Sequence, residues 1–178
     1  MTNTLAVQVP DRPASPEEYA ALQAANARTP EGGAAMTVLA LLVYAEDAAL
    51  GRACLAQAVA PARLQPGPDG YAGQELRRRD MSLLASQMQR HPHLARAYVL
   101  GATPENGYSL PEGEMTLHAS RNPYSGSEES GRVKVFISTA GADSPRPVTL
   151  TRDDPQGLWR AHEWSSLLSG VRAPISGA

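Results

Sequence analysis

Four side chains of this sequence have the chemistry that acid–base catalysis needs: His118, Asp143, His162 and Glu163. Imidazole and carboxylate groups transfer protons when a pocket holds them beside a substrate. His162 and Glu163 are adjacent in a segment with strand character, and neighbouring strand residues point to opposite faces of a sheet. The two therefore cannot line one pocket, and the other interpretation of His162 is a partly exposed histidine beside the core residue Trp164. We assign no catalytic residues.

A second candidate is the segment 141–147, in which Pro145 and Pro147 favour extended conformations in the residues before them. Arg146 presents a planar guanidinium that suits a carboxylate or phosphate, and Asp143 can accept backbone N–H groups in a turn. Either the segment is an interaction loop in which Arg146 grips an anion, or it is a stiff connector braced by Asp143 and Arg146. Gly, Pro, Asp and Ser are typical of connectors, so the second interpretation is favoured.

The signals for metal and cofactor chemistry are weak. His91 and His93 are spaced like metal ligands, but two histidines at this spacing recur by chance and no third ligand is close in the sequence. The single cysteine, Cys54, excludes an internal disulfide, and its place on an apolar helix face indicates a buried thiol. The sequence contains neither a Walker phosphate loop nor a Gly-x-Gly-x-x-Gly motif. We therefore expect no metal and no cofactor.

The elements that must position these residues change character along the chain. Helix-start signals, in which a capping side chain precedes an apolar run, occur at Ser15, Thr29 and Asp47. An amphipathic pattern predicts a further helix over 74–89. Strand patterns follow over 115–119, 132–137, 148–152 and 158–164, with a turn at 153–157. Helices followed by strands predict an α+β fold, with the helices packed on one face of a curved antiparallel sheet.

Length and charge limit the classes of function. A chain of 178 residues is long enough for one domain with a sizeable core. We expect an extended arm over residues 1–14, a single α+β domain over 15–174 and a tail over 175–178. Ordering of the arm would need a supporting surface, either in the same chain or in another. The net charge of −2 argues against nucleic-acid binding by phosphate neutralisation. The chain start lacks secretory-signal features and the apolar stretch 34–50 is too short and polar to span a bilayer, so we expect a cytoplasmic protein without membrane insertion.

A run of motifs in the second half of the chain resembles one uncharacterised bacterial family, catalogued as a domain of unknown function. The motifs are Gly101–Tyr108, Asn122–Tyr124, Gly141–Pro147, Gly157–Trp159 and Trp164–Arg172. The resemblance extends over roughly residues 30–174. It implies membership of a family and no particular activity.

A looser resemblance concerns the fold. The phrase Leu158-Trp159-Arg160 is similar to the last strand of the nuclear transport factor two-like cone, which ketosteroid isomerases and scytalone dehydratase share. This resemblance implies helices that precede a strongly curved sheet, with a pocket between them. The residues that would line such a pocket are Tyr98, Tyr108, His118 and His162.

Because no catalytic constellation converges, the first hypothesis is a non-catalytic protein-interaction or assembly module. Its setting would be a bacterial multiprotein system of the secretion, injection or stress-response type, with the Pro-containing arm lying on a partner. The alternative is a small-ligand-binding protein or an isomerase/dehydratase-like enzyme with a pocket inside the cone. A third possibility is self-association through the outer face of the sheet, which a broad apolar patch there would support.

Overall fold

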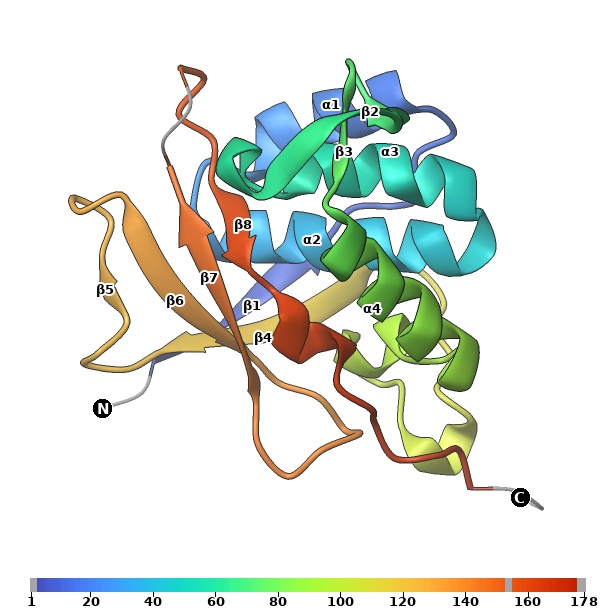
Figure 1. The fold of residues 1–178 in the computed structure, drawn as a ribbon. Helices are drawn as coiled ribbons and strands as arrows, with labels where there is room; N and C mark the ends of the chain where they lie inside the picture. Colours follow the sequence, from blue (N-terminus) through green and yellow to red (C-terminus); the bar gives the residue numbers. More distant parts are fainter. Residues whose placement is uncertain (1–2, 153–154, 176–178) are drawn as a thin grey trace.

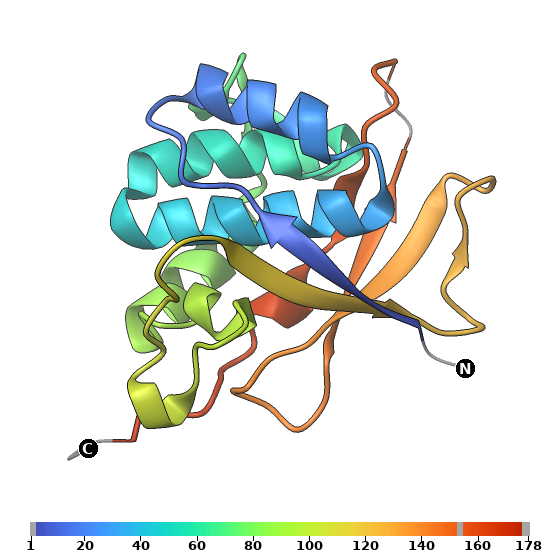
Figure 2. The same cartoon turned by 180° about the vertical axis from the view of Figure 1, so that it is seen from behind.

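The computed structural model describes residues 3–152 and 155–175, in which the helices cover one face of a curved sheet (Figures 1 and 2). The long helices are α1 (Pro16–Asn26), α2 (Pro30–Glu46), α3 (Ala48–Ala58) and α4 (Arg78–Arg90). The strands are β1 (Asn3–Val9), β2 (Leu64–Tyr71), β3 (Gln74–Leu76), β4 (Met115–Arg121), β5 (Gly126–Ser127), β6 (Arg132–Ile137), β7 (Arg146–Thr151) and β8 (Arg160–Glu163). The predicted α+β class is confirmed, and the cone-like identity stays a prediction.

Three helices begin where the sequence predicts. The side chains of Ser15, Thr29 and Asp47 each accept a hydrogen bond from a backbone N–H in the first turn of α1, α2 and α3. These bonds satisfy amide groups that have no partner within the helix.

Helix α2 is the centre of the core. Every residue from Pro30 to Val43 is buried, because α1 and α3 pack on one side of the helix and β1, β6, β7 and β8 lie on the other. A helix that is apolar around its whole circumference needs such an enclosure. Met36, Leu39 and Trp159 are fully buried in this layer, so side chains fill the space between helices and sheet.

The main sheet is antiparallel and has the order β1-β4-β6-β7-β8, with the short β5 paired to β6. Strands β6 and β7 are in continuous register from Arg132 opposite Thr151 to Ile137 opposite Arg146. The inner face of β6 carries Val133, Val135 and Ile137, and the outer face carries Arg132 and Lys134 together with the half-buried Phe136. The outer face is therefore not a broad apolar patch.

Residues 3–9 of the expected arm are extended, but they form edge strand β1 on β4 of the same chain. Val9 is only 1% exposed, so the strand enters the core at its end. In the sequence, the alternation of Leu5, Val7 and Val9 with smaller or polar residues is the pattern that indicates this strand. Residues 3–9 are thus ordered on a surface of the same chain, which is one of the two possibilities for the arm.

The helix predicted over 74–89 begins later, because Gln74–Leu76 is strand β3 of a hairpin with β2. The hairpin turn places Ala72 at φ 52° and Gly73 at φ 80°, so the chain reverses just before the predicted start. Helix α4 then runs over 78–90, with Leu84 and Met88 buried as expected.

Strand β8 covers only Arg160–Glu163 of the predicted 158–164, and it contains a bulge. Thr149 lies opposite Glu163 and Leu150 lies opposite Ala161, so His162 is the extra residue. Glu163 is exposed, and Trp164 is buried just beyond the strand. Of the predicted turn 153–157, residues 153 and 154 lie outside the described residues, as do residues 176–178 of the predicted tail. None of the helices in the described part of the chain is long and apolar enough to cross a membrane.

Candidate binding groove

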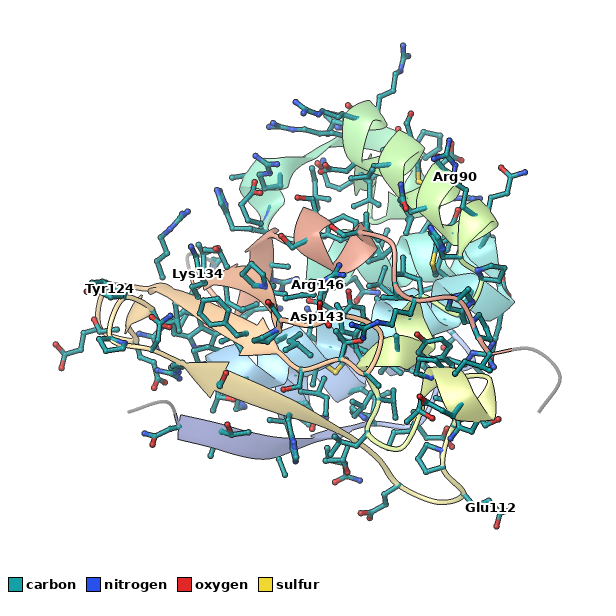
Figure 3. The ribbon with its side chains drawn as sticks, turned by 90° about the horizontal axis from the view of Figure 1, so that it is seen from below. Arg90, Glu112, Tyr124, Lys134, Asp143 and Arg146 are labelled. Carbon is teal, nitrogen blue, oxygen red and sulfur yellow. The ribbon has the colours of Figure 1, made fainter. Side chains whose placement is uncertain are left out.

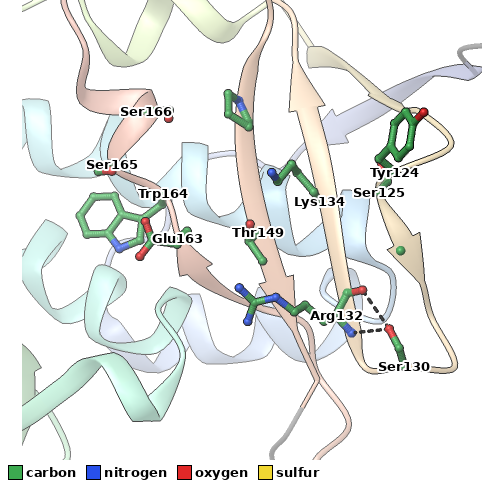
Figure 4. A pocket seen from close by; sticks show the side chains of 12 residues that line it. Tyr124, Ser125, Ser130, Arg132, Lys134, Thr149, Glu163, Trp164, Ser165 and Ser166 are labelled. Atoms are coloured by element: carbon green, nitrogen blue, oxygen red, sulfur yellow. Dashed lines mark hydrogen bonds between the residues drawn. The ribbon is translucent and has the colours of Figure 1, made fainter.

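An open groove of about 710 Å³ lies on the outer face of the sheet (Figure 4). Strands β6 and β7 form its floor. One wall is the end of β8 with the 3₁₀ turn Ser165–Leu168, and the other is the loop that contains Tyr124. The groove is thus built from segments of the second half of the chain.

Strand alternation places two cations in this groove. Val133 and Val135 are buried in the core, so Arg132 and Lys134 project from the opposite face of β6. Lys134 lies opposite Thr149 of β7, which adds a hydroxyl group to the floor. Lys134 is the single lysine of the sequence.

The loop wall is held by its own hydrogen bonds. The Ser130 hydroxyl accepts from the Arg132 backbone N–H at 3.3 Å and donates to the Arg132 carbonyl at 3.1 Å. The Asn122 side-chain oxygen accepts from the Tyr124 N–H at 2.8 Å. This arrangement leaves the Tyr124 side chain 91% exposed at the rim.

The two cations of the groove have no carboxylate partner among the described residues. The Glu163 carboxylate at the opposite wall contacts Arg63 at 3.1 Å and is therefore already paired. In a chain of net charge −2, this face is locally positive. Exposed guanidinium and ammonium groups beside hydroxyls form a surface suited to anionic groups.

A second hollow of about 670 Å³ adjoins the groove and shares Glu163, Trp164 and Ser165 with it. Arg63 and Arg79 line this hollow together with Asp80. Two cations and the two carboxylates of Asp80 and Glu163 line this second hollow, so the positive lining is confined to the groove over β6 and β7.

Tyr98 and Tyr108, two of the predicted pocket residues, are structural. Both are buried, and their hydroxyls donate to the carbonyls of Leu167 at 2.7 Å and Arg172 at 2.6 Å. Burial raises the pKa of both phenols, so they remain protonated donors. Tyr98 lines a small hollow of about 110 Å³ without the other predicted residues.

His118 and His162, the other two, are half-buried on different strands. His118 lies on β4 opposite Ala6 of β1, whereas His162 lies at the bulge of β8. Two strands separate β4 from β8 in the sheet, so the structure does not bring these imidazoles together. Neither residue lines the groove.

The predicted loop residues Asp143 and Arg146 brace the C-terminal segment (Figure 3). The Arg146 guanidinium donates to three carbonyls, those of Ser166 at 3.0 Å, Ser169 at 3.2 Å and Gly170 at 3.1 Å. Asp143 pairs with Arg172, whose backbone N–H donates to the Gly141 carbonyl at 2.9 Å. These contacts favour the interpretation of a braced connector.

The motifs that carry the family resemblance meet at this brace. Tyr108 from one motif and the 141–147 segment from another both contact the segment that ends at Arg172. A family model described as a domain of unknown function, DUF6935, matches residues 11–175. The chain belongs to the DUF6935 family. Comparisons with curated proteins and with solved structures gave no match.

In this DUF6935 protein, His91 and His93 do not form a metal centre. Their ring centroids lie 6.0 Å apart, and the His93 ring stacks on Tyr108 with the centroids 4.8 Å apart. Within the described ranges, no group of three His, Cys, Asp or Glu side chains is placed to hold a metal ion. Cys54 is fully buried, and burial raises the pKa of its thiol to about 12.

Sequence reasoning did not identify the groove residues of the DUF6935 chain as a site. The strand over 132–137 was predicted, and its Arg-Val-Lys-Val pattern already places Arg132 and Lys134 on one face. What the sequence does not show is that the loop with Tyr124 and the turn with Ser165 close around that face.

Proposed function

We propose that this protein is a non-catalytic protein-interaction module that binds an acidic segment of a partner protein in the outer groove. The observation that carries the proposal is the pair of neighbouring cations, Arg132 and Lys134, which lack carboxylate partners among the described residues. Their electrostatic attraction to carboxylates would steer and orient the partner.

The composition of the groove supports a protein partner. Tyrosine and arginine are enriched among the residues that dominate the binding energy of protein interfaces, and the groove combines Tyr124 and Arg132. The exposed Tyr124 ring can cover a peptide from the rim, while the hydroxyls of Thr149 and Ser165 can bond to its backbone. A cytoplasmic, bacterial multiprotein assembly of the secretion, injection or stress-response type remains the setting we propose.

The alternative hypothesis, a ligand or isomerase-like site inside the cone, has less support. Met36, Leu39 and Trp159 fill the interior, and the tyrosines proposed for its pocket bond to backbone carbonyls. Phe136 is half-buried on strand β6, where it lies opposite Pro147.

The single lysine makes a direct test possible. Reductive methylation with ¹³C-formaldehyde labels Lys134 and the chain terminus, so that one side-chain NMR signal reports on the groove. Titration with a short glutamate-rich peptide is expected to shift this signal, and fluorescence anisotropy of the labelled peptide gives its affinity. Added salt should weaken binding because the contacts are charged.

Variants separate the groove from general charge effects. Arg132→Glu is expected to weaken peptide binding about tenfold, since it replaces an attractive contact with a repulsive one. Arg90→Glu makes the same change of charge on α4, away from Lys134 (Figure 3), and should leave the affinity close to that of the wild type. Equal loss in both variants, or an unshifted Lys134 signal, contradicts the proposal. Equal competition by inorganic phosphate would also contradict it, because it would indicate a small-anion site.

A further inference from the structure

The outer edge of strand β1 is open. Strand β1 is the first strand of the sheet and pairs only with β4 within the described part of the chain (Figure 2). None of the backbone hydrogen bonds between described residues outside the strand ladders involves residues 3–9. One side of this strand therefore presents N–H and C=O groups that no other described segment pairs.

This edge lacks the usual protection against pairing. Natural sheets protect edge strands by charged residues, proline, bulges or short length. Strand β1 is 7 residues long, and Asn3–Val9 contains neither a charged residue nor a proline. Its register with β4 is continuous over the whole length, without a bulge.

The opposite edge of the same sheet shows the contrast. Strand β8 is only 4 residues long and carries Arg160 and Glu163. Its outer side is also covered, because Val59 forms a bridge with Ala161 and the Ala60 N–H donates to the Ala161 carbonyl at 2.8 Å. Of the two edge strands of the main sheet, β1 and β8, only β1 is both long and uncovered by described residues.

The side chains of β1 extend the apolar core toward this edge. Leu5, Val7 and Val9 share one face of the strand, and their exposure increases from 1% at Val9 to 53% at Leu5. Leu5 is one of the three large apolar side chains that are exposed among the described residues. The apolar side chains of β1 thus extend from the core to the surface, where they lie beside backbone groups that no described segment pairs.

We propose that two copies of this chain pair through β1, antiparallel about a two-fold axis near Ala6, so that their sheets become continuous. Leu5 of each copy then lies across from Val7 of the other, on the same face. Such cross-strand apolar pairs are the contacts that stabilise antiparallel sheets.

The absence of charge is what favours a second copy as the occupant. In a two-fold antiparallel pair, residues near the axis meet their own equivalents, so a charged residue there would face a like charge. Residues 3–9 contain none, and the polar Thr4 and Gln8 would meet each other across the axis. The strand is therefore self-complementary.

Sedimentation of the full chain at increasing concentration tests the proposal. The wild type is expected to shift reversibly from monomer to dimer. Leu5→Lys should weaken the dimer at least about tenfold, because it places a charge in each apolar pair. Ile175→Lys is a matched control, since Ile175 is also 53% exposed, and it should leave dimerisation unchanged. Circular dichroism of each variant verifies the fold.

A cysteine at the axis tests the geometry. In Ala6→Cys the two new thiols lie opposite each other and should form an intermolecular disulfide under mild oxidation. Cys54 does not compete because it is fully buried. Ile175→Cys should not cross-link at the same protein concentration. A wild type that stays monomeric at all concentrations, a dimer unaffected by Leu5→Lys, or equal cross-linking of both cysteine variants would overturn the proposal.

Discussion

Glu31 in the first turn of α2 and Arg121 at the end of β4 form a two-pronged ion pair, with N···O distances of 2.6 and 2.9 Å. The Glu31 side chain is only 7% exposed, and that of Arg121 is 28% exposed. Hydrogen bonding and charge attraction from Glu31 raise the pKa of Arg121. This contact fixes the central helix to the sheet at the edge where β1 lies.

Removal of Arg121 should therefore destabilise the protein more than neutralisation of Glu31. Arg121→Ala leaves a buried carboxylate without its partner, which we expect to lower the free energy of unfolding by about 3 kcal/mol. Glu31→Gln removes the charge and keeps hydrogen-bonding capacity, so its effect should be smaller. Urea denaturation of both single variants and the double variant measures the coupling. A loss below about 0.5 kcal/mol for Arg121→Ala would contradict the expectation.

Gly33 should be needed in α2 although glycine weakens helices. A Cβ atom at this position would lie 2.6 Å from the carbonyl oxygen of Trp159, which is backbone and cannot move aside. Gly33→Ala gains about 1 kcal/mol of helix propensity, yet we expect a net loss of stability because α2 must shift away from the sheet. Thermal unfolding shows whether Gly33→Ala raises or lowers the stability. Ala85→Gly, on the exposed side of α4, measures how much the difference in helix propensity between alanine and glycine contributes to stability in this protein. A Gly33→Ala variant that is more stable than the wild type would contradict the close contact between α2 and the Trp159 backbone.

Local signals in the sequence predicted much of the fold. The caps at Ser15, Thr29 and Asp47 and the alternating strand over 132–137 depend on residues that are neighbours in the chain. Short-range bonding and side-chain periodicity determine such features, so one sequence is sufficient to read them.

The partners that distant segments find in the fold were not predictable from local patterns. The alternation over residues 3–9 is compatible with a strand, but its partner β4 lies more than a hundred positions away. The bulge at His162 changes the faces to which Glu163 and Trp164 point. The regular alternation of strand side chains, on which the prediction was based, does not indicate where a bulge occurs. The groove required the same long-range information, because its walls come from the Tyr124 loop and the Ser165 turn.

The brace formed by Arg146 should control the order of the C-terminal segment. Lysine has no planar fork and cannot reach the carbonyls of Ser166, Ser169 and Gly170 at once. Arg146→Lys is expected to lower stability by about 1–2 kcal/mol and to speed amide exchange over residues 165–172. Arg172→Lys alters the neighbouring contact with Asp143, which is largely exposed, so it should lower stability less than Arg146→Lys does. Unchanged exchange in Arg146→Lys would contradict the brace.

His93 should make stability depend on pH below neutrality. The residue is only 8% exposed, stacks on Tyr108, and its Nε2 atom has no hydrogen-bond partner among the described residues. Burial, with smaller contributions from His91 and Arg96, lowers its pKa from the ordinary value of 6.5. The neutral ring is therefore the form that the fold accommodates.

The direction in which stability changes with pH follows from the lowered pKa of His93. Between that value and 6.5 the unfolded chain binds a proton that the folded chain does not, so stability is full above about pH 6.5 and falls as the pH decreases. The slope for one group is at most about 1.4 kcal/mol per pH unit. His93→Phe keeps a ring beside Tyr108 and cannot titrate, so its urea midpoint should change less between pH 7 and about 5. A His93→Phe curve parallel to the wild type would show that other groups cause the pH dependence.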